Sequence, residues 1–400
     1  MKPPLKPVGR LDPPPPWMSD RSVRRLLDAL VKGGIAARFV GGCVRNTVLG
    51  RPVDDIDIAV DKPPETVMRT LEAADLKVVP TGLRHGTVTA IVEGRPFELT
   101  TLRRDLETDG RRAVVAFTDD WRADAERRDF TFNALYADPD GTLWDPFDGR
   151  ADLLAGRVRF IGDPDQRIAE DRLRVLRFFR FHAWFGKPPL DSAGFDACRR
   201  NAGTLSALSA ERVTKELLRL LAAPAPADAL AAMAEAGALD HWLPEYAGAA
   251  RLKALVAREE APDPLRRLAA IVSPSAATAV ARRLKLSTQD SLRLQLMLEP
   301  AVPGDPENRR AALYRLGTSL FVDRVLLEGP GDWQAALALA RRWTPPELPI
   351  SGADALALGL KPGPRVGALL EAVERWWIAG DFSADRAACL AELERLARTT

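Results

Sequence analysis

Residues 41–60 read GGCVRNTVLGRPVDDIDIAV, and this stretch decides which fold the sequence predicts. The apolar residues 35–40 before it and the alternating residues 54–60 at its end predict two strands joined by a short helix. The glycine pair after the first strand, which includes Gly42, lets backbone N–H groups approach a phosphate, and the positive end of the helix points to the same place. Arg45, one turn into that helix, is placed to bind the same anion.

Two aspartates in this stretch predict a metal site. Asp55 and Asp57 are two residues apart on the predicted strand, so both carboxylates project from one face and can share divalent ions. Metals held in pairs clamp the attacking hydroxyl and the leaving oxygen of an in-line phosphoryl displacement. An Asp-x-Asp pair alone is more often a solvated strand edge or turn, but adjacent like charges repel, and a metal relieves that repulsion. We predict that Asp55 and Asp57 are the catalytic metal ligands.

Residues 170–181, EDRLRVLRFFRF, predict a helix that reads a nucleotide base. Asp171 and Arg174 are three residues apart, hence side by side on a helix, and Arg177 and Arg180 continue the same surface. An aspartate accepts from an exocyclic amino group and an arginine donates to a ring nitrogen, a pattern that suits cytosine and adenine but not uracil or guanine. A mismatched buried polar group costs roughly 1–3 kcal/mol, enough to select between bases. The simpler alternative is an ordinary ion pair on a solvated helix.

The pattern changes from mixed α/β to helical near residue 150. Residues 86–92 and 95–101 alternate at period two and predict a hairpin, whereas later segments repeat Leu, Ala, Arg and Glu at helical spacing. We expect an α+β head with a mixed sheet, followed by an all-α neck, body and tail. The expected parts are a disordered proline-rich leader (1–18), the head (19–148), a neck with the base-reading helix (149–205), a helical body (206–285) and a helical tail (286–400).

Composition limits the partners. A formal net charge of +2 over 400 residues excludes a chain that is basic throughout, so a polyanion must be met by local clusters. Three widely spaced cysteines cannot form a disulfide framework, which favours a cytoplasmic location. No run of 18 apolar residues is present, so we expect no membrane partner. Nothing in the sequence predicts an obligatory protein partner.

Together these motifs resemble the class II tRNA nucleotidyltransferases and bacterial poly(A) polymerases of the DNA polymerase β superfamily. Residues 127–135, RRDFTFNAL, are similar to the family's second motif nearly letter for letter, and residues 170–174 are similar to its EDxxR motif. The resemblance covers roughly residues 20–250 well and residues 345–370 more loosely. It implies a head domain of the polymerase β-like nucleotidyltransferase type.

The resemblance also implies roles for individual residues. Arg128 and Asp129 would contact the sugar and phosphates of the incoming nucleotide, although Asp129 alone could equally be the N-cap of an apolar helical run. An Arg/Asp pair suits a 2′-hydroxyl, which both donates and accepts. Asp171 and Arg174 would be the amino-acid template for the base, and the arginines that follow would bind the nucleotide.

The implied activity is Mg²⁺-dependent addition of CCA to the 3′ end of tRNA from CTP and ATP, with two Mg²⁺ ions and contacts to the tRNA acceptor arm. The segment 103–126 resembles the family's flexible loop, which favours addition of both C and A. A poly(A) polymerase or a partial adder of the same family stays open. A non-catalytic RNA-binding protein is less favoured, because it would be expected to lose a metal carboxylate and both Asp55 and Asp57 are present. Nucleotidyl transfer to a small molecule is less favoured because that reaction has no use for so long a helical arm.

Two further residues, Glu98 and Asn46, have no assigned role. Glu98 lies in the second strand of the hairpin and could be a third carboxylate beside the aspartate pair, but a surface glutamate is the simpler interpretation, and we leave it out of the metal site. Asn46 stands where many relatives have Asp after the arginine, which puts a specific role for that position in doubt.

Overall fold

The computed structural model describes residues 5–109, 112–299, 308–329 and 331–399. The chain forms two compact units, Met1–Pro244 and Glu245–Thr400. The finer division into head, neck, body and tail stays a prediction.

The first unit contains a mixed sheet. Its strand order is β1-β10-β9-β2-β3-β6-β5-β4, in which β3 and β6 are parallel and the other neighbours antiparallel. A separate antiparallel pair joins β7 and β8. The strands are β1 (Pro7–Arg10), β2 (Ala37–Val40), β3 (Asp57–Val60), β4 (Lys77–Gly82), β5 (Thr87–Val92), β6 (Arg95–Thr101), β7 (Arg103–Asp109), β8 (Arg112–Phe117), β9 (Tyr136–Ala137) and β10 (Thr142–Trp144). The predicted hairpin is β5–β6, and the mixed sheet confirms the predicted head.

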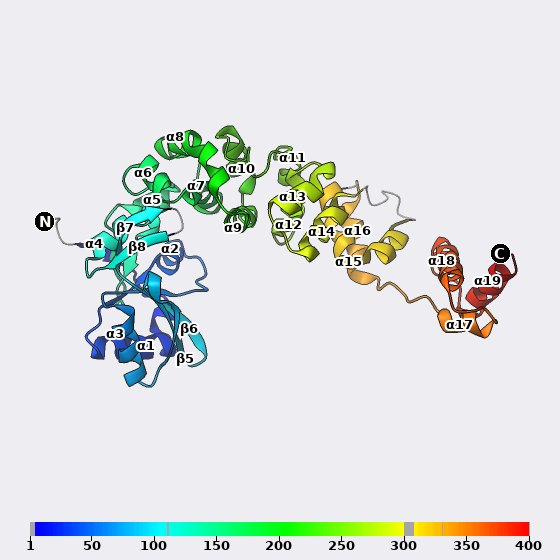
Figure 1. The fold of residues 1–400 in the computed structure, drawn as a ribbon, viewed down its shortest axis with the longest axis horizontal. Coiled ribbons are helices and arrows are strands. Elements are labelled where there is room, and N and C mark those ends of the chain that lie inside the picture. Colours follow the sequence, from blue (N-terminus) through cyan, green and yellow to red (C-terminus); the bar gives the residue numbers. More distant parts are fainter. Residues whose placement is uncertain (1–4, 110–111, 300–307, 330, 400) are drawn as a thin grey trace. The chain divides into compact units, whose positions relative to one another are not determined.

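Helices of the first unit cover the sheet and then continue without it. Helices α1 and α3 lie side by side against β5 (Figure 1). The helices are α1 (Arg21–Lys32), α2 (Gly42–Val48), α3 (Pro64–Ala73), α4 (Trp121–Glu126), α5 (Gly149–Ala155), α6 (Pro164–Glu170), α7 (Leu173–Phe185), α8 (Ser192–Asn201), α9 (Ala210–Leu221) and α10 (Pro226–Glu235). Among the described residues after β10, no named strand occurs, as the loss of alternating pattern predicted.

The prediction of a disordered leader is wrong for the described part of residues 1–18. Residues of β1 pair with β10, and Met18 is buried. The indole of Trp17 donates to Thr47 Oγ1 at 3.1 Å and packs edge-on against Phe39. Prolines in this segment remove backbone donors, but β1 is at the edge of the sheet, where a strand needs to pair on one side only. Residues 1–4 lie outside the described residues.

The segment 103–126 also differs from the predicted loop. Its residues form the antiparallel pair β7–β8, followed by the one-and-a-half-turn helix α4. Asp120 caps α4 by accepting from the backbone N–H groups of Arg122 and Ala123. Residues 110 and 111 lie outside the described residues.

The second unit is helical where it is described. Its helices are α11 (Ala250–Val256), α12 (Pro264–Ile271), α13 (Ala277–Arg283), α14 (Thr288–Leu298), α15 (Arg309–Glu328), α16 (Trp333–Arg342), α17 (Gly352–Ala357), α18 (Pro364–Ala379) and α19 (Arg386–Thr399). A buried carboxylate, Asp323, links three of them, because it accepts from Arg266 of α12 at 2.9 Å and from Arg293 of α14 at 2.8 Å. In the part of the chain that the structure describes, no helix is both long and apolar enough to cross a bilayer.

Candidate functional site

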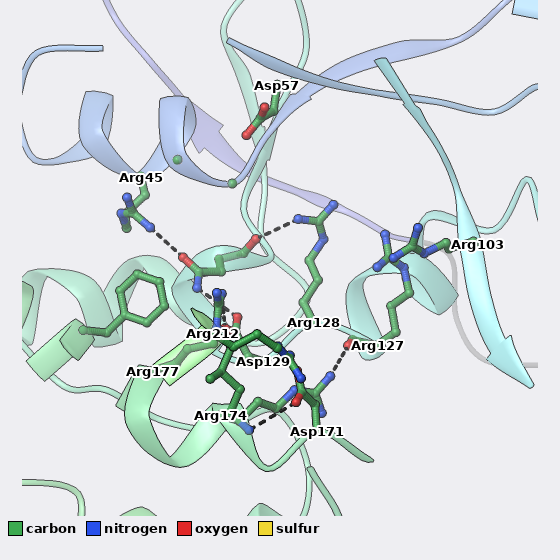
Figure 2. A pocket seen from close by; sticks show the side chains of 15 residues that line it. Arg45, Asp57, Arg103, Arg127, Arg128, Asp129, Asp171, Arg174, Arg177 and Arg212 are labelled. Carbon is green, nitrogen blue, oxygen red and sulfur yellow. Dashed lines mark hydrogen bonds and ion pairs between the residues drawn. The ribbon is translucent and has the colours of Figure 1, made fainter. Parts of the chain in front are cut away.

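A cavity of about 470 Å³ in the first unit brings together residues from six segments of the chain. Seven arginines and three aspartates take part in its lining. Figure 2 shows Asp57 at one end of the cavity and Asp171 with Arg174 at the other. The lining residues are Gly41, Gly42, Arg45, Asp57, Arg103, Arg127, Arg128, Asp129, Asn133, Asp171, Leu173, Arg174, Arg177, Phe181 and Arg212. Of the predicted site residues, only Asp55 and Arg180 are outside this lining.

The two aspartates of the predicted metal site are not both on a strand. Strand β3 begins at Asp57, and Asp55 lies in the irregular segment before it with an exposed side chain. The prediction that both aspartates lie on the strand is therefore wrong for Asp55, whereas its role as a metal ligand stays a prediction. Burial raises the pKa of Asp57, and the negative charges of Glu98 and Asp55 raise it further. Asp57 is thus a half-buried carboxylate, and the negative charges beside it favour the binding of a cation.

Glu98 lies beside Asp57 on the neighbouring strand. The parallel pairing of β3 with β6 places these two residues directly opposite each other, and among the neighbouring charges Glu98 acts most strongly on the pKa of Asp57. Glu98 was left out of the predicted metal site because a surface glutamate on a strand was the simpler interpretation. Its place in the second strand of the predicted hairpin was a signal in the sequence, but the pairing of β3 with β6 could not be read from it.

Oxygen donors of this kind suit magnesium. Within the described residues, no three His, Cys, Asp or Glu side chains converge tightly enough to form a metal centre by themselves. Mg²⁺ is usually bound by one or two carboxylates, with waters and substrate phosphates supplying the rest. The aspartate pair, with its raised pKa at Asp57, fits that mode of binding.

Arg45 stands between this cavity and a second one. It lies in the middle of the seven-residue helix α2, and its Nη1 donates to Asn133 Oδ1 at 2.8 Å. Its guanidinium lies 4.4 Å from the centre of the Phe185 ring. Burial lowers the pKa of Arg45 to about 10, and the positive charge of Arg180 contributes to this. A buried guanidinium that also faces another cation would gain from a bound anion.

The glycine pair leads into α2 as predicted. Gly41 has φ +71°, which places it in the region that glycine adopts at no steric cost. An added Cβ at Gly41 would lie 3.7 Å from Arg128 Nη1, and one at Gly42 would lie 3.8 Å from Arg45 Nη2. Both positions therefore keep side-chain atoms out of the space beside two arginines.

The apolar helical run expected over residues 127–135 does not form. Helix α4 ends at Glu126, and residues 131–133 make only a short 3₁₀ turn. Asp129 is consequently no N-cap of an α-helix; its Oδ1 accepts from the amide of Asn133 and its Oδ2 from Arg177 Nε at 2.7 Å. Burial alone would raise the pKa of Asp129, but the charge of Arg177 and the bonds from Asn133 and Arg177 lower it to about 2.

Arg128 is held by a buried carboxylate that the sequence did not single out. Its Nη2 donates to Asp124 Oδ2 at 3.1 Å, and its Nη1 donates to the carbonyl of Asn133. The hydroxyl of Tyr136 donates to the same Oδ2 at 2.8 Å, and Arg127 pairs with Oδ1 at 2.7 Å. Asp124 therefore holds both arginines of the RRD motif. Asp124 precedes Arg127 and Arg128 by three and four residues, a helical spacing from which these contacts could have been predicted.

The expected helix over residues 170–181 is broken at its start. Helix α6 ends at Glu170, Asp171 has extended φ −152° and ψ 104°, and α7 begins at Leu173. Asp171 and Arg174 are therefore not neighbours on one helix face. The physical reason is local competition, because Asp171 Oδ1 accepts from the backbone N–H of Leu173 and so starts α7 afresh.

Asp171 and Arg174 nevertheless line the same cavity, each with further partners. Asp171 Oδ2 accepts from Arg212 Nη2 of α9 at 2.7 Å. Arg174 pairs with Glu170 at 2.6 Å and donates to the carbonyl of Arg127 at 3.0 Å. Arg212 was missed because it lies 41 residues beyond Asp171, and no local pattern connects them.

Arg177 and Arg180 line two different cavities. Arg177 faces the cavity and binds Asp129. Arg180 is buried and pairs with Glu216 of α9 at 2.5 Å, and it lines the second cavity instead. The two arginines thus do not share one surface, although Glu216 is within 3.8 Å of Arg177 as well.

Comparisons with known proteins agree with this architecture. The family description "Poly A polymerase head domain" matches residues 37–159, and "Probable RNA and SrmB- binding site of polymerase A" matches residues 190–249. The mitochondrial CCA tRNA nucleotidyltransferase 1 of Danio rerio is 33% identical over 88% of this chain and 85% of its own length. The CCA-adding enzyme of Geobacillus thermodenitrificans is 38% identical over 62% of this chain and 61% of its own.

A solved structure is similar along almost the whole chain. The crystal structure of the Bacillus stearothermophilus CCA-adding enzyme in complex with CTP superposes with a TM-score of 0.79 at 29% identity, covering 96% of this chain and 98% of that one. The resemblance seen in the sequence motifs is thereby confirmed. The chain is a nucleotidyltransferase with a polymerase β-like head, and it belongs to the family of CCA tRNA nucleotidyltransferases, or CCA-adding enzymes.

Proposed function

We propose that this protein adds CCA to the 3′ end of tRNA without a nucleic-acid template, using CTP and ATP and releasing pyrophosphate. The observation that supports this most is one cavity that holds a half-buried carboxylate, a set of arginines and the Asp171 side chain together. The relatives that match most of the chain are named for the same activity.

Asp55 and Asp57 would hold two Mg²⁺ ions, with Glu98 as a third carboxylate beside Asp57. Bound there, the metal would lower the pKa of the RNA 3′-hydroxyl and neutralise charge on the triphosphate. Half-burial of Asp57 excludes part of the competing water and strengthens its hold on a cation.

Cationic side chains in the cavity would bind the triphosphate. Arg45, Arg128 and Arg177 all line it, and the side-chain-free backbone at Gly42 leaves space next to them. Guanidinium groups bind phosphate oxygens in pairs of hydrogen bonds, which orients the nucleotide. Arg180 would act less directly, through the Glu216 carboxylate that it shares with Arg177.

The sugar would lie near Arg128 and Asp129. Asp129 already accepts from Phe130, Asn133 and Arg177, so its main effect is to hold Arg177 in place. A 2′-hydroxyl both donates and accepts, and a carboxylate with an adjacent guanidinium offers it both kinds of partner.

The base would be read by Asp171 and Arg174, with Arg212 holding the aspartate. A carboxylate has about four lone-pair sites, and the two contacts of Asp171 leave room for an exocyclic amino group of cytosine or adenine. Arg174 donates to Arg167, Glu170 and Arg127, which orients its remaining N–H groups. A pair fixed in this way would reject uracil and guanine.

The RNA partner would be the tRNA acceptor arm, held mostly through backbone phosphates and A-form shape, since one enzyme must accept many tRNAs. A poly(A) polymerase or a partial adder remains the second candidate. No protein partner is required by the proposed reaction. A cytoplasmic location stays a prediction, and the vertebrate relative is named as mitochondrial.

Incorporation assays test the proposal. The protein is incubated with Mg²⁺, radiolabelled CTP or ATP, and tRNA that ends at the discriminator base, at C or at CC. We expect three additions in the order C, C, A; long A tails on generic RNA would instead assign the protein to the polymerases. Asp55→Ala and Asp57→Asn should abolish incorporation, while Glu65→Gln, an exposed carboxylate on α3, should not.

A further inference from the structure

A second cavity, of about 440 Å³, adjoins the nucleotide cavity on the other side of Arg45. Its walls come from α2, from residues 51–54 that lead into β3, and from the C-terminal turns of α7 and α9. No role has been assigned above to most of its residues. Its volume is in the range of pockets that hold one small ligand such as a nucleotide.

One wall of this cavity is aromatic. Trp184 and Phe185 are adjacent and both partly exposed, with ring centres 6.4 Å apart. The indole N–H of Trp184 donates to the carbonyl of Arg219 at 2.8 Å, which fixes the ring against α9. The Arg51 guanidinium lies 4.9 Å from the centre of the Phe185 ring. Aromatic rings and guanidinium planes of this kind are what unpaired RNA bases stack on.

The other walls are cationic. Arg45, Arg51, Arg180 and Arg219 line the cavity against one carboxylate, Asp54. Arg51 and Arg219 are exposed, and within the described residues neither guanidinium forms an ion pair with a carboxylate. Arg51 donates instead to the backbone carbonyl of Trp184 at 3.1 Å. Two exposed cations beside an aromatic wall suit a phosphodiester with a stacked base.

The geometry of the proposed reaction indicates which substrate the second cavity binds. In-line transfer places the attacking hydroxyl and the leaving pyrophosphate on opposite sides of the reacting phosphorus. The first cavity would hold the incoming nucleotide, so the RNA must reach Asp55 and Asp57 from another side. The second cavity shares Arg45 with the first and is lined by Asp54, the residue before Asp55.

We propose that this second cavity binds the 3′-terminal nucleotide of the acceptor RNA, with Trp184 and Phe185 stacking its base and Arg51 and Arg219 binding its phosphate. The proposal rests on the proposed function. It assigns binding of the two substrates to two separate sets of residues, on either side of Arg45.

A truncation series tests the stacking contact. Binding of fluorescently labelled tRNA is measured by anisotropy, with the RNA ending at the discriminator base or one nucleotide shorter. Removing the terminal nucleotide should weaken binding to the wild type about tenfold or more, and should weaken binding to Trp184→Ala by a clearly smaller factor, because only the Phe185 and arginine contacts remain to be lost. Trp184→Phe, which keeps a ring, should retain most of the wild-type difference. If Trp184→Ala still loses affinity with the shorter RNA as the wild type does, the proposal is wrong.

Phosphate binding by Arg51 and Arg219 is tested by enzyme kinetics and by the salt dependence of tRNA binding. Arg51→Ala and Arg219→Ala should each raise KM for tRNA about tenfold and leave KM for CTP unchanged. Each should also reduce the slope of log affinity against log salt by about 0.7, the value for one phosphate contact on a single strand. Arg25→Ala, an exposed arginine on α1, is the matched control and should change neither quantity.

Failures of the two proposals are distinguishable. A wild-type protein that adds no CMP to tRNA refutes the proposed function. An active wild type whose Arg51 and Arg219 variants change KM for CTP instead of tRNA would show that the cavity binds a second free nucleotide, which overturns the assignment. Unchanged KM for both substrates would also overturn it.

Discussion

Replacing Asp124 by asparagine should loosen the nucleotide site and destabilise the head at the same time. The Asp124 side chain is 1% exposed and accepts from Arg127, Arg128 and Tyr136. Burial alone would raise its pKa, but the charges of Arg128 and Arg127 and the bond from Tyr136 lower it to about 2. Compared with the ordinary value of 3.8, this corresponds to about 2 kcal/mol of stability carried by the charged form.

Asp124→Asn keeps the shape but removes the charge that faces the two half-buried guanidinium groups of Arg127 and Arg128. Breaking a buried pair in this way costs about 3–5 kcal/mol, more than the pKa alone suggests, because the arginines remain uncompensated. Arg128 would then leave its position at Gly41, and KM for CTP should rise about tenfold or more.

Hydrogen exchange measures this prediction in the full chain, because it reports local free energies and need not assume one unfolding step. Amides of α4 and of residues 130–137 should lose about 3 kcal/mol of protection in Asp124→Asn at pH 7. Asp119→Asn makes the same change at an exposed carboxylate five residues away and should have little effect. A loss below about 1 kcal/mol, equal to that of the control, would refute the reasoning.

The contribution of Asp124 to the stability of the head should depend on pH. A lowered pKa in the folded state means that Asp124 stabilises the head above pH 4 and that this contribution disappears as the pH falls from about 4 to about 2. Asp124→Asn has no such group, so the gap in stability between wild type and variant should narrow over that range. A gap that stays constant would mean that charge is not the reason for the loss.

Three further changes follow from the structure. Arg212→Ala removes the cation that holds Asp171, and the ratio of kcat/KM for CTP over UTP should fall about tenfold, as measured with tRNA ending at the discriminator base. Asp323→Asn removes the buried carboxylate that Arg266 and Arg293 share, but Arg266 keeps Glu259 and Arg293 keeps Asp263, so the second unit should lose about 1–3 kcal/mol in hydrogen exchange. Gly149→Ala would place a Cβ 2.2 Å from the backbone oxygen of Thr131, and the midpoint of thermal unfolding should drop by several degrees.

Matched variants separate these effects from general damage. Gly203→Ala adds the same methyl group with nothing within 4 Å, and its unfolding midpoint should equal the wild type's. Asp385→Asn changes a carboxylate at the start of α19 in the second unit that holds no pair of arginines, and should be nearly neutral by comparison. An Arg212→Ala enzyme with full discrimination would show that Asp171 needs no support from α9.

The elements of the head could be read from local pattern. The periodicity around residues 41–60 predicted β2, α2 and β3 in order, and alternation around Glu93-Gly94 predicted the β5–β6 hairpin. Both patterns connect residues that are close in sequence, and over such short distances the spacing of apolar side chains indicates which face is buried. The helical character after β10 was equally readable.

The local sequence pattern does not show which distant segments of the chain come together. Asp57 and Glu98 lie opposite each other through a parallel strand pair about forty residues apart in sequence, and Arg212 reaches Asp171 from another helix. The break before Leu173 was missed for a different reason. The sequence keeps a helical spacing of apolar residues through this point, and the hydrogen bond from the Leu173 N–H to the Asp171 carboxylate, which accompanies the break, is not visible in that spacing.

The pairing of β1 with β10 has a practical consequence. A protein engineer who trims a proline-rich start as dispensable, at residue 18, would remove the outermost strand of the sheet and the Trp17 side chain that packs on Phe39. The newly exposed edge of β10 would present unpaired N–H and C=O groups, which other chains can extend. A shortened version of this protein should therefore self-associate, and a purification tag belongs at the other terminus.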